Sequence, residues 1–257
     1  MDKKQQMEKT QAVAVHVHAT REEMGQAAAA AVRAAMLNVL RNKPKIRMIF
    51  AAAPSQNEFL AALVRLADIP WEKVIGLHMD EYFGLSKDAP QSFGVFLRKH
   101  LFDLVPVGRV EYMDATTTNP VAECARYAAV LAQSPVDIVC LGIGENGHLA
   151  FNDPPIADFA DPLTVKVACL DEQCRLQQVN DGCFPSLAEV PKEALTLTVP
   201  ALLSAPKIFG VVPGPRKAQA VHDALRGPIS TACPASALRT HPDVELFLDT
   251  QSAALLR

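Results

Sequence analysis

Short β-rich runs alternate with segments of helical spacing along nearly the whole chain, and this alternation constrains the fold more than any other feature. Strands are expected at residues 12–17, 46–52, 74–79, 110–113, 136–143, 164–170, 194–199, 208–212 and 244–248. Helices are expected at residues 21–40, 57–66, 92–104, 121–131, 172–180, 216–225 and 235–239. Because repeated strand, helix and strand units pair their strands in parallel and lay the helices over the sheet, the pattern predicts an α/β fold with a mostly parallel central sheet and helices on both faces.

The 257 residues are expected to form a single α/β domain. Prolines fall at or between the ends of the expected elements, and no repeat or linker-like composition divides the chain. Residues 1–11 are polar and are expected to form a disordered tail. The weakest regular pattern lies at 152–161, where prolines bracket an Asp-rich loop, and we treat 152–190 as a candidate active-site lid.

The charge balance and the hydropathy pattern exclude several classes of partner. The chain carries 25 basic and 28 acidic residues without a run of five or six like charges. It therefore lacks the positive electrostatic field that would bind nucleic acid. No stretch reaches the ~18 consecutive apolar residues of a membrane helix, and the polar start lacks the apolar core of a signal peptide. We therefore expect a cytoplasmic protein with no membrane partner. The sequence does not fix the oligomeric state, and a homo-oligomer is one of the options.

The cysteines and histidines form no metal-binding pattern in the sequence. The six cysteines include no C-x-x-C spacing and are expected to be reduced. His16 and His18 are the only close pair of histidines, and no third ligand lies nearby in the sequence. We therefore expect no bound metal.

Two adjacent carboxylates, Asp80 and Glu81, follow the strand expected at 74–79. Ligands of open α/β sheets bind at the carboxyl ends of the strands, so residues at this point are candidates for chemistry. A second carboxylate would raise the pKa of Asp80 above the reference value near ~3.9, toward the range useful for a general base. The alternative is a solvated acidic turn.

A glycine-flanked segment follows the strand expected at 136–143. Gly144 and Gly147 permit a positive φ or a close backbone approach, and His148 comes at the same strand end. A histidine oriented by a carboxylate such as Asp153 is a common acid/base arrangement. The alternative is a histidine with a structural role only.

Two strand-to-helix junctions are candidate anion sites. Ser55, in the sequence Pro-Ser-Gln-Asn-Glu at 54–58, opens an expected helix, and backbone N–H groups at such a point favour an anion. The alternative is a capping box in which Ser55 is the N-cap and Glu58 lies three residues on. The second junction follows the strand expected at 208–212, and Lys217 supplies positive charge there. Arg175 is a further source of positive charge. The alternative for both residues is ordinary surface charge.

Two long motifs in this order resemble the glucosamine-6-phosphate deaminase (isomerase) family: LHMDEYFGL at 77–85 and LGIGENGHLAFNDP at 141–154. The stretch from Val190 to Lys217 also resembles that family, so the likeness covers nearly the whole chain. It implies a Rossmann-like three-layer sandwich, and a reaction that converts glucosamine 6-phosphate and water to fructose 6-phosphate and ammonia without cofactor or metal. The expected partner is therefore a small-molecule sugar phosphate.

The same resemblance implies roles for individual residues. Asp80 matches the base that moves a proton between C2 and C1, and His148 matches the group that opens the pyranose ring. Asn146 and Asp153 stand in the places of the partners that support this histidine. The implied contacts to the substrate and its phosphate fall on Ser55, Gln56, Asn57, Glu81, Gly147, Arg175 and Lys217.

The chain departs from the family pattern at three places, and other readings stay open. The Gly- and Thr-rich phosphate loop of the family reads AAAPSQN at 51–57, Asn146 stands at a position that is Asp or Asn in the family, and Asp153 stands where Glu is usual. One alternative is a 6-phosphogluconolactonase or a related sugar-phosphate isomerase, which the sequence at 151–154 fits less well. Another is a non-catalytic sugar-phosphate sensor, although such a sensor normally carries a DNA-binding segment. No motif distinguishes the gluco from the galacto configuration.

Overall fold

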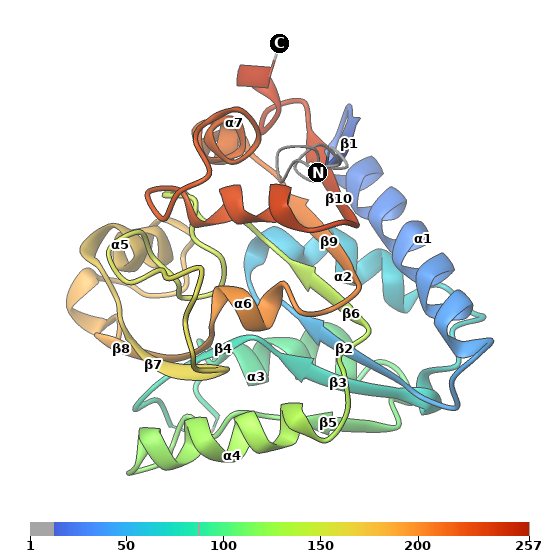
Figure 1. The fold of residues 1–257 in the computed structure, drawn as a ribbon, viewed down its shortest axis with the longest axis horizontal. Coiled ribbons are helices and arrows are strands. Elements are labelled where there is room, and N and C mark those ends of the chain that lie inside the picture. The colour runs from blue at the N-terminus through green and yellow to red at the C-terminus, as the bar shows by residue number, and fades with distance from the viewer. Residues whose placement is uncertain (1–12, 87, 257) are drawn as a thin grey trace, which may run out of the picture.

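The computed structural model describes residues 13–86 and 88–256 (Figure 1), so the tail expected at 1–11 lies outside the described residues. The strands of this part of the chain are β1 Ala14–His18, β2 Ile46–Phe50, β3 Val74–His78, β4 Asp80–Tyr82, β5 Arg109–Glu111, β6 Ile138–Leu141, β7 Val165–Cys169, β8 Glu193–Leu197, β9 Lys207–Val212 and β10 Val244–Asp249. The α-helices are α1 Arg21–Leu40, α2 Asn57–Val64, α3 Phe93–Leu97, α4 Pro120–Ala132, α5 Glu172–Asn180, α6 Val199–Leu202 and α7 Ala218–Arg226. A π-helical turn covers Arg98–Phe102. Short 3₁₀ turns cover Pro54–Gln56, Trp71–Lys73, Leu187–Glu189, Pro215–Lys217, Pro234–Thr240 and Ala254–Leu256.

The main sheet has seven strands in the order β1-β10-β9-β6-β2-β3-β5, and all neighbouring strands are parallel. The inner strand β2 is buried at every residue, as expected for a parallel strand that is covered on both faces. Its alternate residues face opposite cores, with Met48 and Phe50 on one side and Ile49 on the other. The predicted mostly parallel sheet is confirmed.

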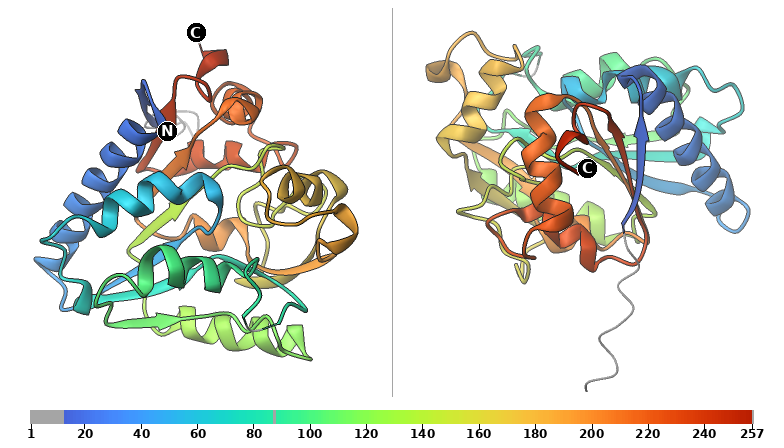
Figure 2. Two further views of the ribbon diagram at one scale, coloured as in Figure 1. Left: turned by 180° about the vertical axis from the view of Figure 1, so that it is seen from behind. Right: turned by 90° about the horizontal axis from the view of Figure 1, so that it is seen from above.

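Helices cover both faces of this sheet. Met24 and Val32 of α1 pack with Phe59 of α2 against one face. Tyr127 of α4 and Val221 of α7 pack against the other face. The view from above in Figure 2 places α1 and α7 on opposite sides of the sheet. The predicted three-layer α/β sandwich is therefore confirmed.

A second sheet, which the sequence analysis does not predict, has three antiparallel strands in the order β4-β8-β7. Strand β4 follows β3 after a single residue, Met79, whose carbonyl accepts a hydrogen bond from the Leu197 N–H at 2.8 Å. The chain therefore leaves the main sheet at Met79 and pairs with β8. The strands expected at 164–170 and 194–199 form, but they belong to this small sheet, because hydrophobic spacing along a strand does not specify which neighbour it pairs with.

The remaining expected elements agree with the structure except at short turns. The helices expected at 21–40 and 172–180 have these bounds. The helix expected at 235–239 is the 3₁₀ turn Pro234–Thr240, and the single-turn helix α6 was not predicted because four residues carry too little periodicity. None of the described helices combines the length and the apolar character needed to cross a bilayer.

The strand order predicts where a ligand can bind. From β2 the chain proceeds to β3 and β5 in one direction across the sheet, and from β6 it proceeds to β9 and β10 in the other direction. In open α/β sheets the crevice outside the carboxyl ends of the strands lies at such a reversal, which here falls between β6 and β2.

Candidate active site

A pocket lies at this reversal point, where the segments that follow β2, β3, β6 and β9 meet α5. It is lined by Ala51, Ala52, Ala53, Ser55, Gln56, Met79, Asp80, Phe93, Gly142, Ile143, Gly144, His148, Ala150, Phe151, Gln177 and Lys217. The structure thus brings Ser55, Gln56, Asp80, His148 and Lys217, predicted from four separate segments, to one pocket. We refer to it as the switch-point pocket.

Two polar residues of its own loop, Asp153 and Asn146, contact His148. Its Nδ1 lies 2.9 Å from Oδ1 of Asp153, which is close enough for an ion pair, and Asp153 is fully buried. The Asn146 Nδ2 donates to the same Oδ1 at 3.0 Å, and the Asn146 Oδ1 accepts from the His148 N–H at 3.0 Å. Because Nδ1 faces the carboxylate, Nε2 is the nitrogen that remains for a ligand. This is the arrangement of an acid/base histidine with an orienting carboxylate.

The charge state of Asp153 follows from these contacts. Burial alone would raise its pKa, but the contacts with His148, Asn146 and Cys174 outweigh burial and hold the pKa of Asp153 below its ordinary value. Asp153 is therefore ionised at neutral pH and can stabilise a positive charge on the imidazole.

Two glycines fix the position of the histidine ring. A Cβ on Gly144 would lie 2.2 Å from Cε1 of His148, so the ring lies directly against the Gly144 backbone. Gly147 has a φ of 84°, which is the left-handed region that favours glycine, and a Cβ there would meet the Cys233 Sγ at 2.6 Å. The close approach expected at Gly144 is therefore to the side chain of His148.

Asp80 is the first residue of β4, and it faces the switch-point pocket from the junction of the two sheets. Burial, and secondly the charge of Glu81, raise the pKa of Asp80 well above its ordinary value. The expected effect of the adjacent carboxylate is thus present, but burial is the larger cause. A carboxylate with a raised pKa is a stronger base once it is ionised.

Glu81 does not face the switch-point pocket, which differs from the expectation that it contacts substrate. Its Oε2 accepts hydrogen bonds from the Ser92 Oγ at 2.7 Å and the Gly94 N–H at 2.9 Å, and its Oε1 accepts from the Phe93 N–H at 3.0 Å. Glu81 therefore satisfies the free N–H groups at the start of α3. The reason is the strand period, because successive side chains of β4 point to opposite faces.

The loop after β2 does not form the capping box that the sequence allowed. Ser55 lies within a 3₁₀ turn, and the N-cap of α2 is Gln56, whose side chain makes no capping bond. The Gln56 Nε2 instead donates to the Val211 carbonyl and to the Ser55 Oγ, each at 3.1 Å, and so ties this loop to the end of β9. Asn57 is exposed and does not line the switch-point pocket. Glu58 points away and forms an ion pair with Arg21 at 3.0 Å.

Lys217 brings the positive charge of the switch-point pocket. It ends the 3₁₀ turn Pro215–Lys217 after β9 and is 7% exposed, and burial lowers the pKa of its ammonium group. Among the described residues its ammonium group makes no hydrogen bond or ion pair, so it is free to bind an anion.

Arg175 does not reach the switch-point pocket. Its Nη2 donates to the carbonyls of Leu187 at 2.6 Å and Val190 at 3.0 Å, so it fastens α5 to the segment that follows it. Gln177, two residues on and about 200° around the helix, lines the pocket instead, and its Oε1 accepts from the Glu145 N–H at 2.8 Å. The sequence analysis missed Gln177 because it used charge as the signal, and charge does not reveal the direction of a side chain.

Comparison with known proteins places the chain in a family. The model of the family described as glucosamine-6-phosphate isomerases/6-phosphogluconolactonase matches residues 19–247. The chain belongs to this family. The match spans β2 to β9 complete, and therefore every segment that lines the switch-point pocket.

Individual proteins that resemble this chain carry one or the other of these two names. A glucosamine-6-phosphate deaminase of Lactobacillus delbrueckii subsp. bulgaricus is 37% identical over 191 residues, which are 74% of this chain and 80% of the relative. A solved structure of a monomeric glucosamine-6-phosphate deaminase has a TM-score of 0.86 and 32% identity, and the alignment covers 95% of this chain and 100% of that one. The 6-phosphogluconolactonase of Thermotoga maritima has a TM-score of 0.75 and 19% identity over 92% of this chain and 99% of that one. At this last level of identity the likeness shows the fold alone.

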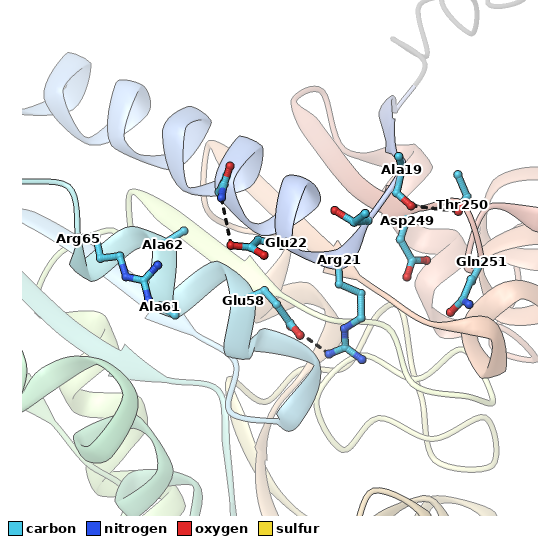
Figure 3. Close-up of a pocket in the computed structure, with 12 residues that line it drawn as sticks. Ala19, Arg21, Glu22, Glu58, Ala61, Ala62, Arg65, Asp249, Thr250 and Gln251 are labelled. Carbon is cyan, nitrogen blue, oxygen red and sulfur yellow. Dashed lines mark hydrogen bonds and ion pairs between the residues drawn. The ribbon is translucent and has the colours of Figure 1, made fainter.

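A second pocket lies where β1 and β10 end, beside the start of α1 (Figure 3). Its charged groups are of both signs: Arg21 pairs with Glu58 at 3.0 Å, and Arg65, Glu22 and Asp249 also line it. None of the residues that the family resemblance implicates lies in this pocket, and it lies at the ends of β1 and β10 and not between β6 and β2. The switch-point pocket is therefore the candidate active site of this family member.

Within the described residues, one group of side chains could hold a metal ion. His148, Asp153 and Cys174 each offer a ligand atom, and these atoms lie within 4.8 Å of one another. The sequence analysis did not find this group because Cys174 reaches it from α5, far along the chain from His148.

Proposed function

We propose that this protein converts glucosamine 6-phosphate and water to fructose 6-phosphate and ammonia. The observation that carries the proposal is that a buried carboxylate, Asp80, and a carboxylate-oriented histidine, His148, face one pocket that also holds the unpaired cation Lys217. Isomerisation of a sugar phosphate needs a base, a group that opens the ring and a cation for the phosphate. The glucosamine-6-phosphate deaminases among the relatives support the choice of reaction.

In this proposal His148 opens the pyranose ring. Its Nε2 delivers a proton to the ring oxygen while the C1 hydroxyl gives its proton to water, which leaves the open-chain aldehyde. Asp153, ionised and 2.9 Å from Nδ1, stabilises the imidazolium form that this proton transfer requires. Asn146 acts as a positioning residue, because it binds both the carboxylate of Asp153 and the backbone of His148.

Asp80 then moves a proton between two carbon atoms. Its carboxylate removes the proton from C2 of the open-chain amino sugar while the aldehyde oxygen takes a proton from water, which forms an enolamine. Asp80 then returns its proton to C1 as the nitrogen releases one proton to water. The product is an imine at C2, and water hydrolyses that imine to the ketone with release of ammonia, so the atoms balance. The raised pKa of Asp80 reduces the difference between its pKa and that of the C2–H group that it deprotonates, which favours the proton transfer.

The phosphate is assigned to the other side of the pocket. Lys217 supplies a positive charge from a buried position, and the Ser55 hydroxyl, whose oxygen accepts a hydrogen bond from the Gln56 Nε2, can donate its own proton. Charge-assisted hydrogen bonds from Lys217 are stronger than neutral ones, so this residue dominates the contact. Arg175, which the sequence suggested for this role, is engaged with carbonyl groups instead.

A lactonase and a non-catalytic sensor are the alternatives to test. Lactone hydrolysis needs no base for a proton on carbon, so the buried Asp80 favours the isomerase reaction over hydrolysis. A sensor needs neither the base nor the oriented histidine. Relatives named 6-phosphogluconolactonase resemble this chain in fold, at a lower level of identity than the deaminases.

The test is a panel of substrates with two simultaneous readouts. Purified protein is incubated with glucosamine 6-phosphate, galactosamine 6-phosphate and 6-phosphogluconolactone, and both ammonia and ketose phosphate are measured. We expect equal amounts of ammonia and fructose 6-phosphate from the first substrate, with the same rate in EDTA. Ketose without ammonia, hydrolysis of the lactone only, or binding without turnover would each contradict the proposal.

Three further expectations accompany this function. The segment 152–190 is proposed as a lid because it contains α5, which contributes Gln177 to the pocket. Residues 1–257 are proposed to act as one domain. A cytoplasmic location is favoured by the six free thiols. A homo-oligomer stays a prediction, which a measurement of molecular mass in solution would decide; one solved relative is described as monomeric.

A further inference from the structure

The group His148, Asp153 and Cys174 joins the candidate active site to a buried thiol. His148 and Asp153 come from the loop after β6, and Cys174 comes from the first turn of α5. The three residues are 8%, 0% and 1% exposed, and their nearest potential ligand atoms all lie within 4.8 Å. Such a distance is within the reach of three ligands of one metal ion after small side-chain adjustments.

One buried oxygen of this group, the Asp153 Oδ2, has no hydrogen-bond partner of normal geometry among the described residues. The other oxygen, Oδ1, is engaged by the His148 Nδ1 at 2.9 Å and the Asn146 Nδ2 at 3.0 Å. Most buried polar atoms in folded proteins are paired, so an unpaired one indicates unused binding capacity. Asp153 is fully buried, and the Cys174 thiol contacts its carboxylate from α5.

The donor set selects a particular kind of metal. Imidazole nitrogen, carboxylate oxygen and thiolate sulfur are the ligands of Zn²⁺ in proteins, and three protein ligands leave a fourth position for water. A thiolate ligand disfavours Mg²⁺ and Ca²⁺, which prefer oxygen. On binding, Zn²⁺ replaces the proton of the Cys174 thiol, and that proton passes to the solvent.

We propose that His148, Asp153 and Cys174 form a Zn²⁺-binding site whose occupation inhibits the enzyme. A metal ion bound to the imidazole and to Asp153 takes away the carboxylate that orients His148 and fixes the ring where it cannot exchange a proton with substrate. The site thus makes the enzyme sensitive to zinc. The inhibitory consequence rests on the proposed function, whereas binding of the metal does not.

The test compares Cys174→Ser with the wild type, and uses Cys169→Ser, which changes an exposed thiol, as the matched control. Co²⁺ is added as a spectroscopic substitute for Zn²⁺, and thiolate-to-cobalt absorption reports binding independently of activity. We expect this absorption in the wild type and in Cys169→Ser, and its loss in Cys174→Ser. Cys174→Ala serves as a second variant if serine in this buried position impairs folding, which thermal denaturation will show.

Inhibition is then measured as ammonia release against Zn²⁺ concentration, with Mg²⁺ as a negative control and EDTA for reversal. Losing an outer-shell partner of a metal site costs about 10–100-fold in affinity, so losing the thiolate ligand should raise the half-inhibiting Zn²⁺ concentration by about 100-fold or more. Equal inhibition or equal cobalt absorption in the wild type and the Cys174 variants would overturn the proposal. So would wild-type protein that binds no Co²⁺. If cobalt binds as expected but no substrate is turned over, the proposed function fails and the metal site stands.

Discussion

Replacing Gly144 by alanine tests whether the position of the His148 ring sets the rate of the reaction. Gly144 has no positive φ, so alanine can adopt its backbone conformation, and the only obstacle is space. A Cβ at this position would lie 2.2 Å, 2.3 Å and 2.4 Å from Cε1, Nε2 and Cδ2 of His148. The ring must therefore move, and its contact with Asp153 must change with it.

The size of the movement follows from these distances. An ordinary contact begins near 3.4 Å, and the nearest ring atom stands at 2.2 Å, so the ring must retreat by about 1.2 Å. A misplacement of about 1 Å in a catalytic group can cost about 100-fold in rate, which corresponds to about 2.7 kcal/mol in the activation free energy. We therefore expect kcat for glucosamine 6-phosphate to fall by about 100-fold in Gly144→Ala, as measured by ammonia release.

The matched control is Gly210→Ala in β9. A Cβ there would meet Cδ2 of Leu246 at the same 2.2 Å, but within the core and away from the pocket. Overpacking of this kind costs about 1–3 kcal/mol of stability, so the melting temperature should fall while kcat per folded molecule is retained. A Gly144→Ala enzyme with wild-type kcat would refute the reasoning, because the ring of His148 could then shift without consequence.

Three other substitutions have distinct expected outcomes. Asp80→Asn should slow exchange of the C2 proton with solvent by ~100-fold or more. Because burial raises the pKa of Asp80, ionisation of this carboxyl destabilises the folded protein, and the free energy of unfolding should decline as the pH rises through that raised pKa. The Asn variant should lack this decline. It should therefore melt at a higher temperature than the wild type at pH 8. Wild-type activity should rise over the same pH range, since the base must be ionised. Lys217→Met should raise KM for the phosphorylated sugar by ~10-fold, about 1.4 kcal/mol, and equal turnover of unphosphorylated glucosamine by the wild type would rule out a phosphate site there. Arg175→Ala should lower the melting temperature and leave KM unchanged, because its hydrogen bonds are to backbone carbonyls.

The sequence predicts the main sheet and the residues at its strand ends because both depend on local pattern. Asp80 follows β3 after one residue, and His148 and Asp153 share one loop, so short motifs contain the information about their positions. The fold class follows from the alternation of strands and helices, which is equally local. These are the parts of the structure that the sequence analysis predicts correctly.

The parts that it misses depend on direction or on long-range pairing. Glu81 and Arg175 are charged and stand near the site in sequence, yet the first points to the opposite face of β4 and the second to the carbonyls after α5. Gln177 and Cys174 reach the site only because α5 packs beside the loop after β6, and nothing in the helical pattern of α5 specifies that neighbour. The second sheet escaped prediction for the same reason, since its strands pair across more than one hundred residues between Asp80 and Thr196.

Both sheets support the residues that line the switch-point pocket. Asp80 opens β4, and the loop with His148 is fastened to β8, where the Phe151 N–H donates to the Thr196 Oγ1 at 3.1 Å and the Asn152 Nδ2 donates to the Leu197 carbonyl at 2.8 Å. Ser55 and Lys217 follow strands of the main sheet, as the His148 loop itself does after β6, but only that loop is also fastened to β8 in this way. The proposed sugar end of the pocket thus depends on both sheets. An exchange of the β7 to β8 region between relatives is therefore expected to act mainly on the sugar end, and because this region also carries Asp181, which pairs with Arg216 next to Lys217, the same exchange measures how far the phosphate end depends on the small sheet.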